Sequence, residues 1–432
     1  MSDHLARDIR PDLLDYLFGL TLHGVKLGLH NISKLLEAAG NPHRAYSTIH
    51  VAGTNGKGSV AAFLDAMLRA AGYRTGKFTS PHLLDLSERF QVDGAPIPVE
   101  ALEENIEFFR KTAEAAGFAP TFFEACTAVA FRWFQQSAID VGVIEVGMGG
   151  RLDSTNVIAP LVSLITNIDL EHTQYLGNTL AQIAFEKAGV LKPGTPAVTG
   201  ETREEPLAVI AGRADALKCP LTIAGCDFSH SVEGGPWEQR LSYASPGLSI
   251  YSAPLGLPGR YQADNAALAV AAAERLRGPL PRLTEEAICR GLAEAHWPCR
   301  LERVLEAPPV IVDVAHNVAG VRRLIESVEH CVTILGVASD KDAAGMIELL
   351  APRSHPLILT AFSGKRALPV EDLRRAAAQH PCETVPTLSE ALERGMEYAR
   401  PDLPLLITGS IYTAGEARRM LVERYGALPL QF

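Results

Sequence analysis

The chain has 432 residues, which is enough for two or three domains with large buried cores. Its formal net charge of −10 argues against the basic surface that proteins coating nucleic acid present. Hydrophobic residues make up 47% and charged residues 21%, which excludes a disordered chain and indicates a globular one.

Membrane insertion and export are not indicated either. No apolar run reaches the roughly 18 to 20 residues that cross a bilayer, and charged residues stand among the first ten, where a secretory signal has its apolar core. The seven cysteines form no CxxC pair, so the sequence indicates neither a disulfide framework nor a structural zinc site. We therefore expect a cytoplasmic, monomeric protein that contacts neither membrane nor nucleic acid.

Strand-like and helix-like segments alternate along the chain, which is typical of an α/β protein with a mainly parallel sheet. In the first part we expect strands at 46–51, 74–79, 141–146, 161–166 and 196–199, and helices at 59–71, 99–117, 121–137, 179–188 and 206–217. The Gly, Pro and Ser content of residues 220–258 predicts an irregular or antiparallel extension, followed by a helix over 263–277.

The alternation restarts after residues 296–300. Strands are expected at 309–313, 331–337, 356–360 and 404–408, with helical patterns between them. We therefore predict two domains, 1–297 and 298–432, with a hinge near 296–300.

The strongest local motif is the glycine-rich loop at residues 51–59, which stands between an expected strand and an expected helix. Glycines let backbone N–H groups turn toward phosphate oxygens, the helix N-terminus adds positive potential, and Lys57 reaches the β- and γ-phosphates. The loop departs from the common G-x-x-x-x-G-K-[ST] pattern, because two residues separate Gly53 from Gly56 and Gly58 precedes Ser59. The alternative is a plain glycine-rich turn with an exposed lysine.

Three segments offer magnesium ligands at strand ends, where open α/β sheets bind ligands: 79–82, 143–153 and 166–172. Glu145 is the foremost candidate, since a carboxylate in an apolar strand is costly unless it is paired or bound to a cation. A salt bridge to an arginine is its alternative. Histidine is an unusual magnesium ligand, so chemistry alone assigns His172 a hydrogen-bonding or structural role.

Taken in order, these segments resemble the folylpolyglutamate synthase and dihydrofolate synthase family, within the Mur-ligase-like ATP-dependent amide ligases. The resemblance runs from about Leu20 to Gly415, and the ordered set of motifs is highly specific. The motifs are KLGL (26–29), VAGTNGKGS (51–59), FTSPHL (78–83), TFFE (121–124), GGRLDSTN (149–156), EKAG (186–189), GRYQADNA (259–266), DVAHN (313–317), DKD (340–342) and TGS (408–410).

The resemblance implies a phosphate-loop domain with a mainly parallel sheet, followed by a smaller Rossmann-like α/β domain, as in Mur ligases. It also implies an ATP and magnesium site. ATP would be held by Gly56, Lys57, Gly58, Ser59, Asn265, Arg300 and Asp313, with Asn265 at the base and the last two reaching over from the second domain. Magnesium would be held by Ser80, Glu145, His172 and Lys187, with Lys187 carbamylated.

The resemblance also implies binding residues for the organic substrates. Phe123, Leu152 and Asp153 match positions that line the pterin or folate site, and His316 and Ser410 would place the incoming glutamate. The resemblance therefore implies that ATP and magnesium drive the addition of L-glutamate to a reduced folate, and also to dihydropteroate, through an acyl phosphate. Lys57, Lys187 and His316 are the expected catalytic residues.

Departures from the family pattern occur at Lys26, which precedes Leu27 where some dihydrofolate synthases carry an acidic residue, at Cys299, which precedes Arg300 in place of glycine, and at Val318, which replaces a proline. Two other functions stay open at this point. One is a Mur-type ligase acting on a peptidoglycan precursor, and the other is a nucleotide-dependent switch without ligase activity.

Overall fold

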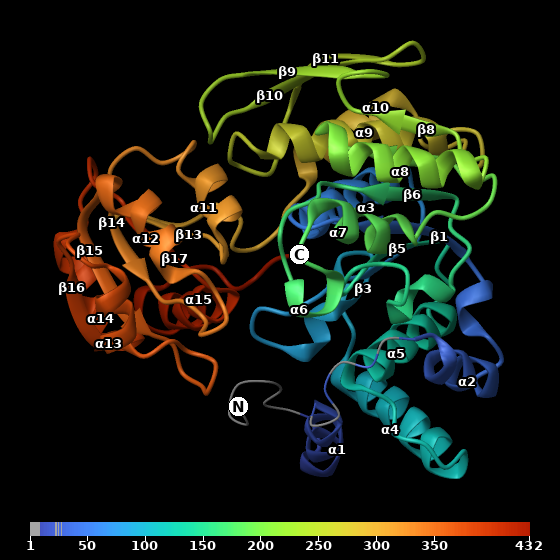
Figure 1. Ribbon diagram of the computed structural model, residues 1–432, viewed down its shortest axis with the longest axis horizontal. Helices are drawn as coiled ribbons and strands as arrows, with labels where there is room; N and C mark the ends of the chain where they lie inside the picture. The colour runs from blue at the N-terminus through green and yellow to red at the C-terminus, as the bar shows by residue number, and fades with distance from the viewer. Residues whose placement is uncertain (1–8, 22–23, 25, 27) are drawn as a thin grey trace.

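The computed structural model describes residues 9–21, 24, 26 and 28–432, and Figure 1 shows two lobes side by side. Two expectations lie outside the described residues: the absence of a leader over the first eight residues, and Leu27 of the 26–29 motif. None of the helices in the described ranges combines the length and the hydrophobicity of a transmembrane span.

The larger lobe is built on an eight-stranded sheet in the order β4-β3-β2-β5-β1-β6-β7-β8. From β2 to β8 in this order all neighbours pair in parallel, whereas β3 and β4 form an antiparallel edge. The strands are β1 (Ser47–Ala52), β2 (Thr75–Phe78), β3 (Phe90–Val92), β4 (Ala95–Pro96), β5 (Val141–Glu145), β6 (Val162–Ile165), β7 (Ala197–Thr199) and β8 (Leu221–Ile223).

Helices cover both faces of this sheet, because its central strands are apolar on both sides. Val141 and Val143 of β5 join one core cluster, and Ile144 of the same strand joins the opposite one. The first face carries α3 (Lys57–Ala70), α9 (Gln262–Leu276) and α10 (Glu285–Glu294). The second carries α1 (Pro11–Thr21), α2 (His30–Ala38), α4 (Val99–Ala115) and α5 (Phe122–Gln136). A third cluster joins β6 and β7 to α7 (Leu180–Ala188) and α8 (Glu204–Ala216), and the short helix α6 (Thr173–Leu176) precedes α7.

A small antiparallel sheet, ordered β11-β10-β9, lies beyond α9 at the top of Figure 1. It consists of β9 (Ser229–Glu233), β10 (Arg240–Ala244) and β11 (Ser249–Pro254), whose buried Leu241, Tyr243 and Ile250 complete the first core cluster. The antiparallel extension expected over 220–258 is therefore present. Its first residues differ from the expectation, because β8 pairs in parallel with β7 and extends the main sheet.

The smaller lobe has a six-stranded sheet in the order β12-β13-β17-β14-β15-β16, which is parallel except for β12. Its strands are β12 (Glu302–Glu306), β13 (Pro309–Val312), β14 (Cys331–Leu335), β15 (Ser354–Ala361), β16 (Glu383–Thr387) and β17 (Leu405–Thr408). Its helices are α11 (Val318–Leu324), α12 (Ala343–Leu350), α13 (Val370–Ala376), α14 (Leu388–Tyr398) and α15 (Ile411–Tyr425). The predicted fold class, a mainly parallel phosphate-loop domain followed by a smaller α/β domain, is confirmed.

The segment that joins the lobes packs closely on both. Trp297 belongs to the core of the larger lobe, whereas Cys299 and Leu301 belong to cores of the smaller one. A Cβ atom placed on Gly58, at the start of α3, would lie 2.9 Å from the indole nitrogen of Trp297. We propose on these grounds that the domain boundary lies at 297–298, as the sequence predicts.

A buried cluster of charges fixes α3 to the sheet beneath it. Asp65 of α3 accepts hydrogen bonds from the Thr75 hydroxyl at 2.6 Å and from Arg69 at 3.0 Å. Lys77 of β2, whose side chain is 1% exposed, places its Nζ 3.6 Å from the same carboxylate and 4.7 Å from the ring centre of Trp297. Burial lowers the pKa of Lys77, and Asp65 opposes that shift.

We predict that Asp65→Ala lowers the free energy of unfolding by about 3 to 5 kcal/mol, because it leaves the Lys77 ammonium buried without its partner. Urea unfolding followed by circular dichroism measures the change. Asp215→Ala is the control: Asp215 pairs with Lys218 at the surface, 84% exposed, so its removal should cost less than about 0.5 kcal/mol. Equal effects of the two substitutions would contradict the prediction.

Candidate active site

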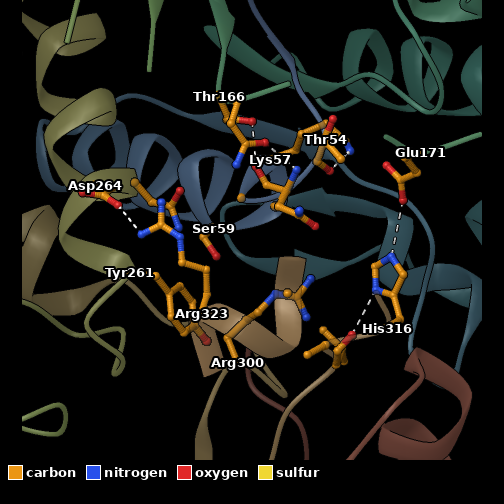
Figure 2. A pocket seen from close by; sticks show the side chains of 18 of the residues that line it. Thr54, Lys57, Ser59, Thr166, Glu171, Tyr261, Asp264, Arg300, His316 and Arg323 are labelled. Atoms are coloured by element: carbon orange, nitrogen blue, oxygen red, sulfur yellow. Dashed lines mark hydrogen bonds and ion pairs between the residues drawn. The ribbon is translucent and has the colours of Figure 1, made fainter. Parts of the chain in front are cut away.

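A cavity of about 740 Å³ lies between the two lobes (Figure 2). The larger lobe contributes the loop after β1 and the residues that follow β5 and β6. The smaller lobe contributes the segments after β13 and β17. Carboxyl ends of parallel strands from both sheets therefore meet at one site, which is where open α/β sheets bind ligands.

The glycine-rich loop takes its shape from contacts with the end of β6. Gly53 has φ 140°, and a Cβ atom there would lie 1.8 Å from the Thr166 hydroxyl, so only glycine fits. The Asn55 N–H donates to the Asn167 side chain at 2.9 Å, and the Thr166 hydroxyl donates to the Asn55 carbonyl at 2.6 Å. The next glycine, Gly56, has φ 87° and turns the chain into α3. The loop thus presents the N-terminus of α3 to the cavity.

Lys57 is the first residue of α3 and lines the cavity. Its Nζ donates to the carbonyls of Gly53 at 3.1 Å and Thr54 at 3.0 Å, so the side chain lies back across its own loop. The ammonium group and the helix N-terminus act on the same space, which gives a site for an anion such as a phosphate chain. The geometry supports a phosphate-binding loop over the alternative, a plain glycine-rich turn with an exposed lysine.

A second lysine reaches the same loop. Lys187 of α7 is buried, and its Nζ donates to the Gly53 carbonyl at 2.7 Å. Burial lowers the pKa of Lys187 to about 7, and the charge of Lys57 adds to the shift. Near pH 7, Lys187 is therefore a neutral amine in a substantial fraction of the molecules. The neutral amine is the form that reacts with carbon dioxide.

Glu145, the last residue of β5, is buried and faces this cavity. One of its carboxylate oxygens accepts the Ser80 N–H at 3.0 Å, and it makes no ion pair with an arginine among the residues described here. Burial raises the pKa of Glu145, while the charges of Lys57 and Arg300 oppose the rise. Glu145 therefore lies against cations without being neutralised by direct contact.

Ser80 and His172 line the same cavity, and the His172 Nε2 lies 3.9 Å from a Glu171 oxygen. The described part of the chain contains no group of three or more His, Cys, Asp or Glu side chains that would hold a metal by itself. The hydroxyl of Ser80 and the carboxylate of Glu145 are nevertheless hard oxygen donors beside the phosphate loop. They fit a magnesium ion that takes its other ligands from phosphate oxygens and water.

The predicted ATP ligands outside the loop also line the cavity. Asn265 of α9 donates to the Gln262 side chain at 2.8 Å, and Gln262 donates to the Ser59 hydroxyl at 3.2 Å, which ties α9 to the phosphate loop. Arg300, from the segment between the lobes, extends its guanidinium toward the centre of the cavity (Figure 2).

Asp313 is a bracing residue as well as a cavity residue. Its carboxylate accepts the N–H groups of Leu301 and Ala315, both at 2.8 Å, and the Tyr261 hydroxyl at 3.1 Å. Burial raises the pKa of Asp313, and the charge of Arg300 is the foremost opposing effect. Asp313 thus holds the start of the smaller lobe against Tyr261 of the larger one.

His316 and Ser410 come from the smaller lobe and line its side of the cavity. The His316 Nδ1 donates to the Val314 carbonyl at 3.0 Å, and its Nε2 lies 3.5 Å from a Glu171 oxygen of the larger lobe (Figure 2). The Ser410 hydroxyl accepts the Tyr412 N–H at 3.2 Å and caps α15.

Sequence reasoning gave Glu171 no role, although it stands in one of the segments singled out for ligands. Burial alone would raise the pKa of Glu171, but the hydrogen bond with His316 and the charge of Lys57 hold it well below its ordinary value. Its position next to His172, in the loop between β6 and α6, was the available signal. The contact with His316 depends on the approach of the two lobes, which no local pattern encodes.

The three predicted pterin residues do not line this cavity. The Phe123 ring packs against Gly147, where a Cβ atom would lie 2.4 Å from the ring, and its centre is 5.9 Å from that of Phe78. The Asp153 carboxylate accepts the Met148 N–H at 2.8 Å and the Thr155 hydroxyl at 2.5 Å, and Leu152 precedes it in the same loop. All three lie on or beside the loop that follows Glu145, and their role in substrate binding stays a prediction.

Comparison with known proteins agrees with this geometry. The family model of the Mur ligase middle domain matches residues 51–273, and that of the Mur ligase glutamate ligase domain matches residues 299–411. A folylpolyglutamate synthase of Lacticaseibacillus casei is 37% identical over 92% of this chain and 95% of its own length. A dihydrofolate synthase/folylpolyglutamate synthase of Bacillus subtilis is 34% identical over 95% of this chain and 98% of its own.

Solved structures give the same result. The Mycobacterium tuberculosis folylpolyglutamate synthase complexed with ADP and AMPPCP has a TM-score of 0.86 and 33% identity to this chain. The alignment covers 97% of this chain and 100% of that one.

The lowered pKa of Lys187 predicts a specific pH dependence of stability. Between its folded pKa of about 7 and the ordinary value of 10.5, the unfolded chain binds a proton that the folded chain does not, so stability rises with pH in this range. Lys187→Met removes this contribution. From pH 7 to pH 9 the wild type should gain about 2 to 3 kcal/mol relative to the variant, in buffer free of carbon dioxide.

Urea unfolding at pH 7, 8 and 9 measures this difference. Lys218→Met is the control, because Lys218 is 81% exposed and its loss should leave the pH dependence of the wild type in place. Identical slopes for the wild type and Lys187→Met would contradict the prediction.

Proposed function

Because the chain belongs to the folylpolyglutamate synthase and dihydrofolate synthase family of Mur-type ligases, we propose that it joins L-glutamate to a reduced folate, and also to dihydropteroate, at the expense of ATP. The observation that carries the proposal is the cavity shared by both lobes, with a phosphate loop on one side and Arg300, His316 and Ser410 on the other. A ligase must bring a nucleotide and two organic substrates together, and both lobes supply polar side chains to one space.

The reaction must first replace a poor leaving group, the hydroxide of the carboxylate. A carboxylate does not react with an amine at neutral pH, so one of its oxygens attacks the γ-phosphorus of ATP, the bond to the bridging oxygen breaks, and ADP leaves. The task of the protein at this step is positioning and electrostatics. Lys57 and the N-terminus of α3 stabilise charge on the phosphoryl group, and Arg300 approaches it from the other lobe.

The acyl phosphate then reacts with the neutral amine of glutamate. The carbon–nitrogen bond forms, the carbon–oxygen bond to phosphate breaks, and the proton of the nitrogen leaves with the phosphate. We assign His316 and Ser410 to the placement of glutamate, since both face the cavity from the smaller lobe. The contact between His316 and Glu171 supports this, because it fixes the imidazole beside the phosphate loop.

Magnesium supplies charge neutralisation on the phosphate oxygens when it is bound. We propose Ser80, Glu145 and His172 as its protein ligands, on the strength of their place around the cavity. We further propose that Lys187 is carbamylated and contributes to a second ion. Its neutral amine is the nucleophile for carbon dioxide, and the product is an anionic oxygen ligand suited to a hard cation.

The two lobes are proposed to close around residues 296–300 during the reaction, because a closed site excludes water from the acyl phosphate. The proposal also includes a monomer in the cytoplasm. A single chain provides both sides of the cavity, so a partner subunit is not needed to complete it.

The experiment that tests this function incubates the protein with ATP, magnesium and L-glutamate, and offers dihydropteroate and a reduced folate in separate reactions. Mass spectrometry should show one added glutamyl unit on each acceptor. Addition to the folate alone would restrict the activity to folate glutamylation. Addition to neither, together with activity on a UDP-muramyl substrate, would overturn the proposal in favour of a Mur-type function.

Lys57→Ala is expected to lower glutamate-dependent ADP formation by about 10²-fold or more, because it removes the cation that meets the transferred phosphoryl group. A coupled ADP assay at saturating substrates measures the rate. Lys218→Ala, at an exposed site far from the loop in sequence, should leave the rate unchanged. An unchanged rate in Lys57→Ala would remove this lysine from the mechanism.

A further inference from the structure

A histidine and an arginine beside the active site form a pair that the mechanism above does not use. The Arg89 Nε donates a hydrogen bond to the His82 Nδ1 at 2.8 Å. A ring nitrogen that accepts a hydrogen bond carries no proton, so the proton of the neutral imidazole is on Nε2. Arg89 therefore fixes His82 as a hydrogen-bond donor through Nε2.

Arg89 is buried, with 7% of its surface exposed. An arginine buried to this extent is unusual if it serves only as a structural contact. It forms no ion pair with a carboxylate within the described ranges of the chain. The adjacent Glu88 is committed elsewhere, since its carboxylate accepts the backbone N–H groups of Leu83, Leu84 and Asp85. Burial lowers the pKa of Arg89, and the charges of Glu145 and Glu88 oppose this without a direct ion pair, so the buried guanidinium can still stabilise a further anion.

The aromatic environment of Arg89 supplies no further negative charge. Its guanidinium lies over the ring of Phe122, 5.4 Å from the ring centre, at the start of α5. A cation–π contact lowers the cost of burial and leaves the positive charge in place. The field of Arg89 consequently polarises the imidazole of His82 and strengthens its Nε2–H as a donor.

His82 opens onto a small side cavity of about 30 Å³, which adjoins the main one. The two cavities share Gly58, Ser80, Glu145 and Arg300. The side cavity has room for one water molecule or one oxygen-bearing group of a ligand. Within the described part of the chain, His82 makes no hydrogen bond through Nε2 to another residue.

We propose that His82, held by Arg89, donates a hydrogen bond from Nε2 to the acceptor carboxylate, at the oxygen that does not attack phosphorus. The inference rests on the proposed ligase function, and it assigns the site for the reacting end of the acceptor to the space between Ser80, His82 and Arg300. His82 is a catalytic residue in this proposal, and Arg89 is a positioning residue that acts through it.

The hydrogen bond gains strength as the reaction proceeds. The oxygen bound by His82 becomes the carbonyl oxygen of the acyl phosphate, and it takes up negative charge when the amine of glutamate adds to the carbon. As phosphate departs with the nitrogen's proton, the carbonyl forms again. His82 keeps its proton throughout, so its contribution is electrostatic stabilisation of an oxyanion by a preorganised donor.

Two isosteric substitutions separate this role from packing. His82→Asn places its side-chain oxygen where Nδ1 stands, so it satisfies Arg89 and lacks the distal donor. His82→Gln places its amide nitrogen where Nε2 stands, so it keeps the donor. We expect His82→Asn to lower kcat for glutamate addition by about 10²-fold and His82→Gln to stay within about tenfold of the wild type, with the Kd for ADP unchanged in both.

Arg89→Met is expected to lower kcat less than His82→Asn does, since it frees the tautomer without removing the imidazole. Equal rates for His82→Asn and the wild type would overturn the proposal. A lower rate in His82→Gln than in His82→Asn would also overturn it, and so would a loss of ADP affinity that matches the loss of rate.

A second measurement needs no variant. Long-range ¹⁵N–¹H spectra of the histidine-labelled protein report which ring nitrogen carries the proton, and we expect Nε2 for His82. A proton on Nδ1 would overturn the proposal even if a variant failed to fold. Failure of the ligase function itself is recognised separately, because the wild type would then add no glutamate to either acceptor.

Discussion

Two lysine side chains converge on one backbone carbonyl, that of Gly53, and the active site depends on this arrangement. Lys57 comes from the helix that follows the loop and Lys187 from a helix 130 residues later. Neither makes an ion pair with a carboxylate in the described part of the chain, so the positive charge of Lys57 remains available to a phosphate chain. Burial lowers the pKa of Lys187, and the charge of Lys57 adds to the shift. The same crowding thus favours the neutral amine of Lys187, which the carbamylation proposed above requires.

Much of the architecture could be predicted from the sequence, because the central strands of both sheets are short apolar runs and most of them are followed by an α-helix. The strand over Ser47–Ala52 and the helix over Lys57–Ala70 follow from the spacing around the loop, and the restart after Trp297 marks the second sheet. The strands at or near the edges of the sheets were not predicted. The strands β3, β4, β8, β12 and β16 are short or partly polar, and they exist because a neighbouring strand offers them hydrogen bonds, which is a tertiary effect.

The candidate site divides along the same line. Lys57 and Glu145 could be found because each breaks a local rule, a lysine inside a glycine loop and a carboxylate inside an apolar strand. Glu171 and the bracing role of Asp313 could not, because their partners come from distant segments. The cavity is bordered by contacts between lobes on two sides, His316 with Glu171 at 3.5 Å and Arg323 with Asp264 at 2.8 Å (Figure 2). The pair between Arg323 and Asp264 is half-exposed and opens at small energetic cost, whereas Glu171 is largely buried.

The contact between Gly58 and Trp297 explains why the phosphate loop has an additional glycine. In the common pattern a serine or threonine directly follows the lysine, whereas here Gly58 separates Lys57 from Ser59 and the indole of Trp297 occupies the space of the missing side chain. Gly58 therefore allows the segment that connects the lobes to pack closely, in addition to its place in the phosphate loop. Position 58 and position 297 can vary only as a pair, since any bulk gained at one must be given up at the other. A chain that lost this fit would keep its phosphate loop and still misplace its second lobe.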